Sequence, residues 1–192
     1  METSPSILDI FNFNGESLVS MKIGDRFVML SGRNGDTIIP YSETYSSLHH
    51  ADYNQDGLED LKVSIRSNTP NQSETYLFHP EDRTFVKLAN CDLDFEKVPG
   101  SEYFYSYNRD GCADFSWQSH LFLIRGDSAV IAAELENKQC GERGDGIFVY
   151  RVKGLQRLLI ESLPVKTFSV EGADNKFDFI QAYWTANARR FE

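Results

Sequence analysis

The chain has 192 residues, of which 41% are apolar and 13% aromatic. This length fits one domain, or at most two very small ones, and this composition can fill a hydrophobic core, which excludes an intrinsically disordered chain. The formal net charge of −10 argues against nucleic acid or an anionic membrane surface as the partner, and it is compatible with a basic protein partner.

Short runs rich in β-branched and aromatic residues recur along the chain, and turn dipeptides such as Asn14-Gly15 and Asn34-Gly35 separate them. Such runs predict the antiparallel strands of an all-β protein. The predicted strands are residues 7–13, 26–30, 37–41, 61–65, 74–80, 102–107, 117–124, 129–136, 146–152 and 177–184. Residues 154–163 are the nearest candidate for a helix, although their apolar run also suits a strand. We therefore predict a single all-β domain over residues 1–192, with antiparallel strands in a propeller-like or sandwich arrangement.

No stretch of the sequence approaches the roughly 18 to 20 apolar residues of a membrane-spanning helix, so we expect no membrane span. The first residues, METSPSILDIF, contain neither the basic region nor the long apolar region of a signal peptide. Two histories fit this segment: a cytosolic protein, or an exported protein whose signal peptide is absent from the chain.

The three cysteines bear on the cellular compartment. A hairpin is predicted in which Ile124 faces Ala129 across a tight turn. Extending this register leaves Cys112 and Cys140 one residue out of facing positions, just beyond the open end of the hairpin, where a disulfide would fit. A disulfide would imply an oxidising compartment, whereas two unrelated thiols are the alternative. Cys91 is left over and could compete for Cys112.

The stretch DYNQDGLED, residues 52–60, places oxygen-bearing side chains at alternate positions of a short loop. Gly57, at position 6, permits the left-handed turn that would let the carbonyl of Leu58, at position 7, join these side chains. Oxygen ligands at this spacing suit Ca²⁺, while a plain turn rich in Asp and Asn is the alternative. The predicted calcium ligands are the side chains of Asp52, Asn54, Asp56 and Asp60 and the carbonyl of Leu58. An EF-hand is excluded, because position 12 is Val63 instead of a glutamate.

A second segment, SYNRDGCADF at residues 106–115, repeats this pattern. Asn108, Asp110 and Asp114 correspond to three of the predicted ligands, but position 1 has become Ser106, which removes a carboxylate. The segment is either a degenerate copy of the loop, as blade-like repeats of about 50 residues would produce, or a chance match. Binding of a second ion is therefore left open.

The DxNxDGxxDL loop, with the strand that follows it, resembles the calcium loops of FG-GAP and VCBS-type repeats. With residues 74–96 included, the layout of about residues 45–136 is similar to that of a group of bacterial periplasmic proteins. Some members of this group are immunity proteins that neutralise cell-wall hydrolases delivered by type IV or type VI secretion. Residues 1–44 and 137–192 carry no resemblance of this kind.

This resemblance implies a periplasmic immunity protein whose signal peptide has been removed. Such a protein would bind and inhibit a cognate secreted antibacterial effector, a peptidoglycan hydrolase, and would hold Ca²⁺ in a structural role. A calcium-stabilised structural or adhesive module without inhibitory activity is the alternative, because calcium loops of this type serve many functions.

We expect that the protein is not an enzyme. The sequence contains no nucleophile elbow, no HExxH motif and no glycine loop for phosphate. Glu134 and Glu136 would share one face of a strand, as glycosidase carboxylates could, although such a pair is usually just a solvated face. A hydrolase with an unrecognised site is therefore a third hypothesis.

The predicted partner-binding residues lie in the charged, glycine-rich loop 137–146, at Glu142, Arg143 and Asp145. Cys140 would anchor this loop if the disulfide forms. The loop at 67–74 is less constrained, so ordering it on binding would cost more conformational entropy.

Overall fold

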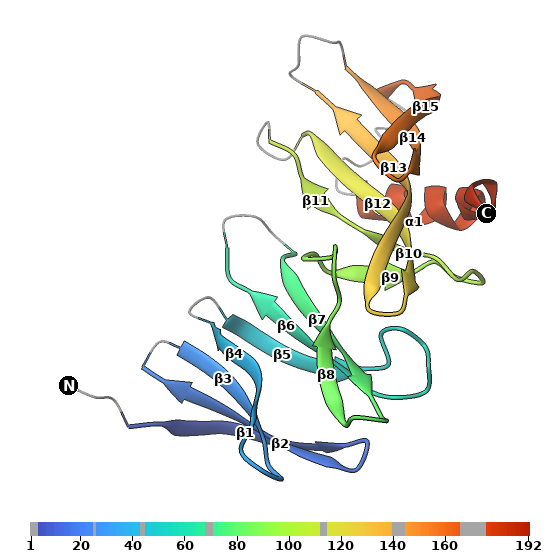
Figure 1. Cartoon of the computed structure of the whole chain (residues 1–192). Coiled ribbons are helices and arrows are strands. Elements are labelled where there is room, and N and C mark those ends of the chain that lie inside the picture. Colours follow the sequence, from blue (N-terminus) through green and yellow to red (C-terminus); the bar gives the residue numbers. More distant parts are fainter. Residues whose placement is uncertain are drawn as a thin grey trace. The chain divides into compact units, whose positions relative to one another are not determined.

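The computed structural model describes residues 4–24, 26–42, 45–67, 71–111, 115–139, 145–165 and 176–192. The chain divides into two compact units, each of which is described separately (Figure 1). The N-terminal unit comprises Met1–Asn68 and Gln72–Leu88, and the C-terminal unit comprises Thr69–Asn71 and Ala89–Glu192. The prediction of a single all-β domain over residues 1–192 is not tested by this division and stays a prediction.

The N-terminal unit contains two four-stranded antiparallel sheets, and in each sheet the strands lie in chain order. Four-stranded meanders of this kind are the modules from which propeller blades are made. The first sheet consists of β1 (Ser6–Phe13), β2 (Glu16–Ile23), β3 (Arg26–Ser31) and β4 (Thr37–Ser42). The second consists of β5 (Tyr45–Ala51), β6 (Asp60–Ile65), β7 (Ser73–His79) and β8 (Thr84–Lys87).

Both sheets contribute to one hydrophobic core in the N-terminal unit. Its buried members are Leu18, Phe27, Met29 and Ile39 from the first sheet and Leu61, Val63 and Tyr76 from the second. Fully burying a large apolar side chain contributes roughly 1.5–3 kcal/mol. The two sheets are therefore held together mainly by apolar packing between their facing side chains.

The C-terminal unit is built on a seven-stranded antiparallel sheet. Its strands are β9 (Phe95–Lys97), β10 (Phe104–Ser106), β11 (Asn108–Arg109), β12 (Trp117–Arg125), β13 (Ser128–Lys138), β14 (Gly146–Lys153) and β15 (Gln156–Leu163). The order is β15-β14-β13-β12-β10-β9, with β11 also paired to β12. The helix α1 (Lys176–Asn187) and a 3-10 turn at Ala188–Phe191 pack on the sheet through Trp184 and Phe191, in a core that contains Trp117 and Leu135.

The structure confirms the predicted all-β class with antiparallel strands, but it corrects one predicted element. Residues 177–184, expected as a strand, lie in α1. Tyr183 and Trp184 are adjacent and both buried, whereas a strand would point them to opposite faces. Ile180, Trp184 and Ala188 are buried four residues apart, which is the helical period.

The predicted hairpin is present as β12 and β13, and Ile124 lies opposite Ala129 as expected. A bulge between Leu121 and Phe122 then shifts the register by one residue toward the open end. Cys112 and Cys140 lie outside the described residues, so their disulfide stays a prediction.

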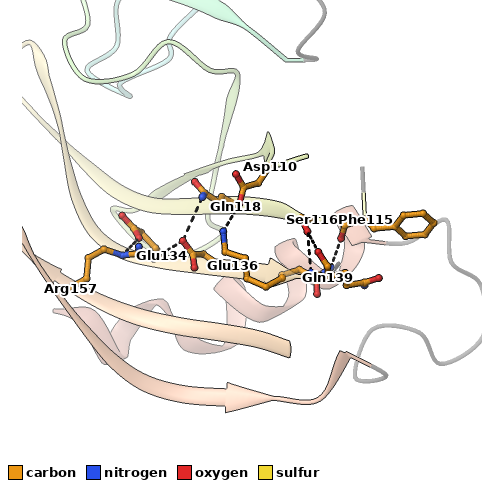
Figure 2. A network of polar contacts seen from close by, with 10 residues as sticks. Asp110, Phe115, Ser116, Gln118, Glu134, Glu136, Gln139 and Arg157 are labelled. Atoms are coloured by element: carbon orange, nitrogen blue, oxygen red, sulfur yellow. Dashed lines mark hydrogen bonds and ion pairs between the residues drawn. The ribbon is translucent and has the colours of Figure 1, made fainter. Parts of the chain in front are cut away.

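Hydrogen bonds close the open end of this hairpin, opposite its turn (Figure 2). The Ser116 hydroxyl donates to the Gln139 carbonyl at 2.8 Å and accepts from the Gln139 N–H at 3.0 Å. The Asn137 amide donates to the Phe115 carbonyl at 2.6 Å. The third cysteine, Cys91, is a buried thiol that donates to the carbonyl of Leu93 at 3.5 Å.

Candidate functional site

The acidic loop 52–60 connects β5 to β6, and all five predicted calcium ligands lie in its described residues. Its tight coil needs two left-handed backbone positions, Gln55 with φ of 65° and Gly57 with φ of 93°. A Cβ added at Gly57 would meet nothing within 4 Å. The requirement for glycine there is therefore conformational and not a matter of space.

Side-chain oxygens of the loop accept hydrogen bonds from its own backbone. The Asp52 carboxylate accepts from the N–H groups of Asp56 at 3.1 Å and Gly57 at 3.0 Å. The Asn54 amide oxygen accepts from Asp56 N–H at 3.0 Å, and the Asp56 carboxylate accepts from Leu58 N–H at 2.8 Å. These bonds turn oxygen atoms from three alternate residues toward the inside of the coil.

Asp60 holds the loop to the sheet. Its side chain is fully buried, and one carboxylate oxygen accepts from the N–H groups of Tyr53 at 2.9 Å and Asn54 at 3.3 Å. The other oxygen accepts from Phe78 N–H of β7 at 2.9 Å. Burial raises the pKa of Asp60 to about 6, because the loss of solvent outweighs the three backbone hydrogen bonds, and the charge of Asp56 adds to the rise.

A residue that the sequence analysis did not select also fixes the loop. Asn14, in the turn between β1 and β2, donates its amide to the Glu59 carbonyl at 2.7 Å and accepts from the Glu59 N–H at 3.1 Å. Its backbone is left-handed, with φ of 52°. The sequence marked Asn14 only as a turn residue, because no local pattern links it to a loop 45 residues away.

The chemistry of the donor set fits Ca²⁺, since every predicted ligand atom is an oxygen. Within the described part of the chain, however, no three His, Cys, Asp or Glu side chains are gathered as a metal-binding group. The loop carboxylates are directed to backbone N–H groups, as described above. The assignment of calcium therefore depends on the ligand types and their spacing.

The described residues of the second acidic segment are arranged differently. Ser106 is buried at the end of β10, and Gly111 is left-handed with φ of 88°, as Gly57 is in the first loop. Asp110 forms an ion pair with Lys138 of β13, which supplies the positive charge beside this carboxylate (Figure 2). Asp114 lies outside the described residues. The arrangement of Asp110 therefore gives no support for a second ion.

Glu134 and Glu136, the pair considered for a hydrolase, are held by one arginine (Figure 2). Arg157 of β15 places Nε 2.5 Å from a Glu134 oxygen and Nη2 2.6 Å from a Glu136 oxygen. Gln118 also donates to Glu136 at 3.5 Å. Arg157 of β15 therefore joins both β13 carboxylates in one ion-pair network.

His120 lies opposite Glu134 in the β12–β13 ladder. Burial lowers the pKa of His120 below its ordinary value, against the opposing influence of Glu134, and the positive charge of Arg157 lowers it further. The imidazole is therefore neutral at pH 7 and adds no positive charge beside Glu134.

Of the predicted partner-binding residues, Asp145 is exposed immediately before β14. Glu142 and Arg143 lie outside the described residues. The partner surface in this loop stays a prediction. No helix in the described part of the chain is long and apolar enough to cross a membrane.

Comparisons with known proteins give no family. No family model matches the chain, and no curated protein matches it. A type IV secretion system related protein from Xanthomonas is 14% identical, with a TM-score of 0.49 over 82% of this chain and 87% of that one. A candidate 6-phosphogluconolactonase from Bacteroides uniformis is 11% identical, with a TM-score of 0.31 over 81% of this chain and 56% of that one. Similarity of this degree assigns neither a fold family nor a function.

Proposed function

We propose that the protein is a periplasmic immunity protein that binds and inhibits a secreted antibacterial effector, a peptidoglycan hydrolase, and that a structural Ca²⁺ occupies the 52–60 loop. The observation that supports the calcium assignment is the alternate spacing of Asp52, Asn54 and Asp56 in a coiled loop with a left-handed Gly57. The inhibitory role follows from the resemblance of this loop to those of periplasmic immunity proteins.

The proposed ion has a structural role. The side chains of Asp52, Asn54, Asp56 and Asp60 and the carbonyl of Leu58 would hold it. Bound there, Ca²⁺ would supply positive charge to a loop whose sequence contains three aspartates, Asp52, Asp56 and Asp60. Because the loop is hydrogen-bonded to Phe78 and Asn14, an ion that fixes the loop would also restrain β7 and the β1–β2 turn.

Two observations favour binding over hydrolysis. Arg157 forms ion pairs with both Glu134 and Glu136, which are the two carboxylates considered for a glycosidase. The net charge of −10 would speed the approach of a basic partner. An immunity role needs only a rigid scaffold that presents a surface to the effector.

Replacing Asp56 by alanine will lower the melting temperature only when calcium is present. Binding at about 100 times the Kd contributes roughly 2.7 kcal/mol, which corresponds to about 5–10 °C for a chain of this size. In a chelator, the exposed Asp56 contributes little, so the two proteins will melt nearly together. Thermal unfolding with and without calcium checks this, and equal melting of both proteins in both conditions contradicts the calcium assignment.

The inhibitory role is tested by immobilising the calcium-loaded protein and passing over it the secreted proteins of its own bacterium. We expect retention of one cell-wall hydrolase, identified by mass spectrometry, and stoichiometric loss of its activity on peptidoglycan. An unrelated protein of equal net charge serves as the control for nonspecific capture of basic proteins. Retention of nothing beyond this control contradicts the immunity role and favours the structural or adhesive module.

A further inference from the structure

The C-terminal unit contains a cavity of about 240 Å³ that the calcium loop does not touch. It lies between the edge of the sheet at β9 and β10 and the first turn of α1. Its walls combine aromatic rings with two acids: Phe95, Tyr105, Tyr107, Phe177, Asp94 and Glu96. The volume is below the roughly 300–1,000 Å³ of typical small-molecule sites, so it suits a single side chain better than a cofactor.

The aromatic wall already attracts a cation of the protein itself. Tyr107 and Phe177 meet edge to face with ring centroids 4.8 Å apart. The ammonium of Lys176 lies 4.8 Å from the centroid of Tyr107 and 5.3 Å from that of Phe177. Positive groups within about 6 Å of a ring centroid are attracted by the electrons of the ring face. This part of the cavity wall is therefore chemically suited to an ammonium or guanidinium group.

The acids supply the complementary charge. The Tyr105 hydroxyl donates to Glu96 at 2.6 Å, which fixes the orientation of that carboxylate. Burial and the neighbouring Glu96 keep the pKa of Tyr105 well above its ordinary value, so the hydroxyl remains a donor. Asp94 adds a second negative charge to the wall. Asp178, in the first turn of α1, offsets the partial positive charge of the helix N-terminus near the cavity.

We propose that this cavity receives a lysine or arginine side chain of a partner protein. The aromatic rings would contact the aliphatic stem and the cationic head, and Asp94 and Glu96 would pair with the positive charge. That the side chain comes from a protein partner rests on the proposed immunity function. The preference of the cavity for a cationic side chain does not, because it follows from the residues of the wall alone.

The cavity is tested on the full chain without any partner. N-acetyl-arginine amide is titrated against the protein while backbone amide shifts are followed by NMR, and N-acetyl-citrulline amide, which is nearly the same shape but neutral, is titrated in parallel. We expect saturable shifts at the cavity residues and about tenfold weaker binding of the citrulline compound, because its charge is missing. Equal binding of the two compounds, or no shifts at the cavity, overturns the proposal without any variant.

Matched variants locate the binding within the wall. Glu96→Gln will weaken arginine amide binding several-fold. Glu102→Gln removes the same charge from the β9–β10 turn but lies outside the cavity lining, where Glu102 pairs with Arg125 at 3.2 Å, and will leave binding unchanged. Lys176→Met removes the internal competitor and will strengthen binding. Equal effects of the two glutamate variants would mean general electrostatic attraction and overturn the site.

Together, the effector capture and the arginine amide titration distinguish failure of the cavity proposal from failure of the proposed immunity function. If an effector is captured but neither Glu96→Gln nor excess arginine amide weakens its binding, the cavity proposal fails while the immunity function stands. If no effector is captured but arginine amide binds with the expected preference, the immunity function fails and the cation-binding cavity stands.

Discussion

Replacing Trp184 by alanine will lower the free energy of unfolding by about 3–5 kcal/mol, the usual cost of truncating a large buried aromatic side chain. Trp184 is fully buried, contacts the rings of Tyr183 and Phe191, and donates its indole N–H to the Ser119 hydroxyl of β12 at 2.8 Å. The variant therefore loses both the packing of α1 on the sheet and a buried hydrogen bond. Chemical denaturation followed by circular dichroism measures the change.

A neighbouring position distinguishes the helix from the strand that the sequence indicated. In a strand, Ala182 would share the buried face with Ile180 and Trp184, and Ala182→Arg would be as damaging as the tryptophan change. In α1, Ala182 is exposed, so Ala182→Arg will change the stability by less than about 0.5 kcal/mol. Large losses in both variants would contradict the helix.

Replacing Asp60 by alanine will destabilise the protein by about 3–5 kcal/mol even in the presence of a chelator. Three buried or partly buried N–H groups, those of Tyr53, Asn54 and Phe78, lose this acceptor, and a buried donor without a partner costs roughly 1–3 kcal/mol. Burial of the charge offsets part of this contribution, as its raised pKa of about 6 indicates. This part of the loss does not require calcium, in contrast to the effect expected for Asp56, and in the presence of calcium the loss of a proposed ligand will add to it.

Two further variants control this experiment. Asp60→Asn keeps one acceptor oxygen and will lose less stability than Asp60→Ala. Glu59→Ala removes a charge at the next position, but its carboxylate forms only a half-exposed pair with His50 at 3.4 Å, so the loss will stay below about 1 kcal/mol. Equal stability of the Asp60→Ala and Glu59→Ala proteins would show that Asp60 does not anchor the loop.

The strand β2 was not predicted from the sequence, because two of the three residues on its buried face are polar. In β2, the buried positions are Glu16, Leu18 and Ser20, so the alternation of apolar and polar residues that marks a half-buried strand is absent. Glu16 is tolerated inside because Arg83, from the turn between β7 and β8, pairs with it. The residues near Glu16 in the sequence do not indicate that its ion-pair partner lies 67 residues away.

The candidate calcium loop was predictable in its own residues but not in its attachments. The spacing from Asp52 to Asp60 is a local pattern, and the left-handed turn at Gly57 follows from the residue type. The bonds from Asp60 to Phe78 and from Asn14 to Glu59 join different strands, so only the folded chain brings their atoms together. The same holds for Arg157, which converts two glutamates from a candidate catalytic pair into a bridged pair.

By itself, the sequence determined the all-β class, most strand positions, the turn of the β12–β13 hairpin and the residues of the acidic loop. These features depend on side-chain alternation and on turn residues, which act over a few neighbouring positions. Only the tertiary structure decided that residues 176–187 form a helix, that Asp60 is buried and that an aromatic and acidic cavity opens beside α1. Those features depend on which distant surfaces pack together, because burial and hydrogen-bond partners are properties of the whole fold.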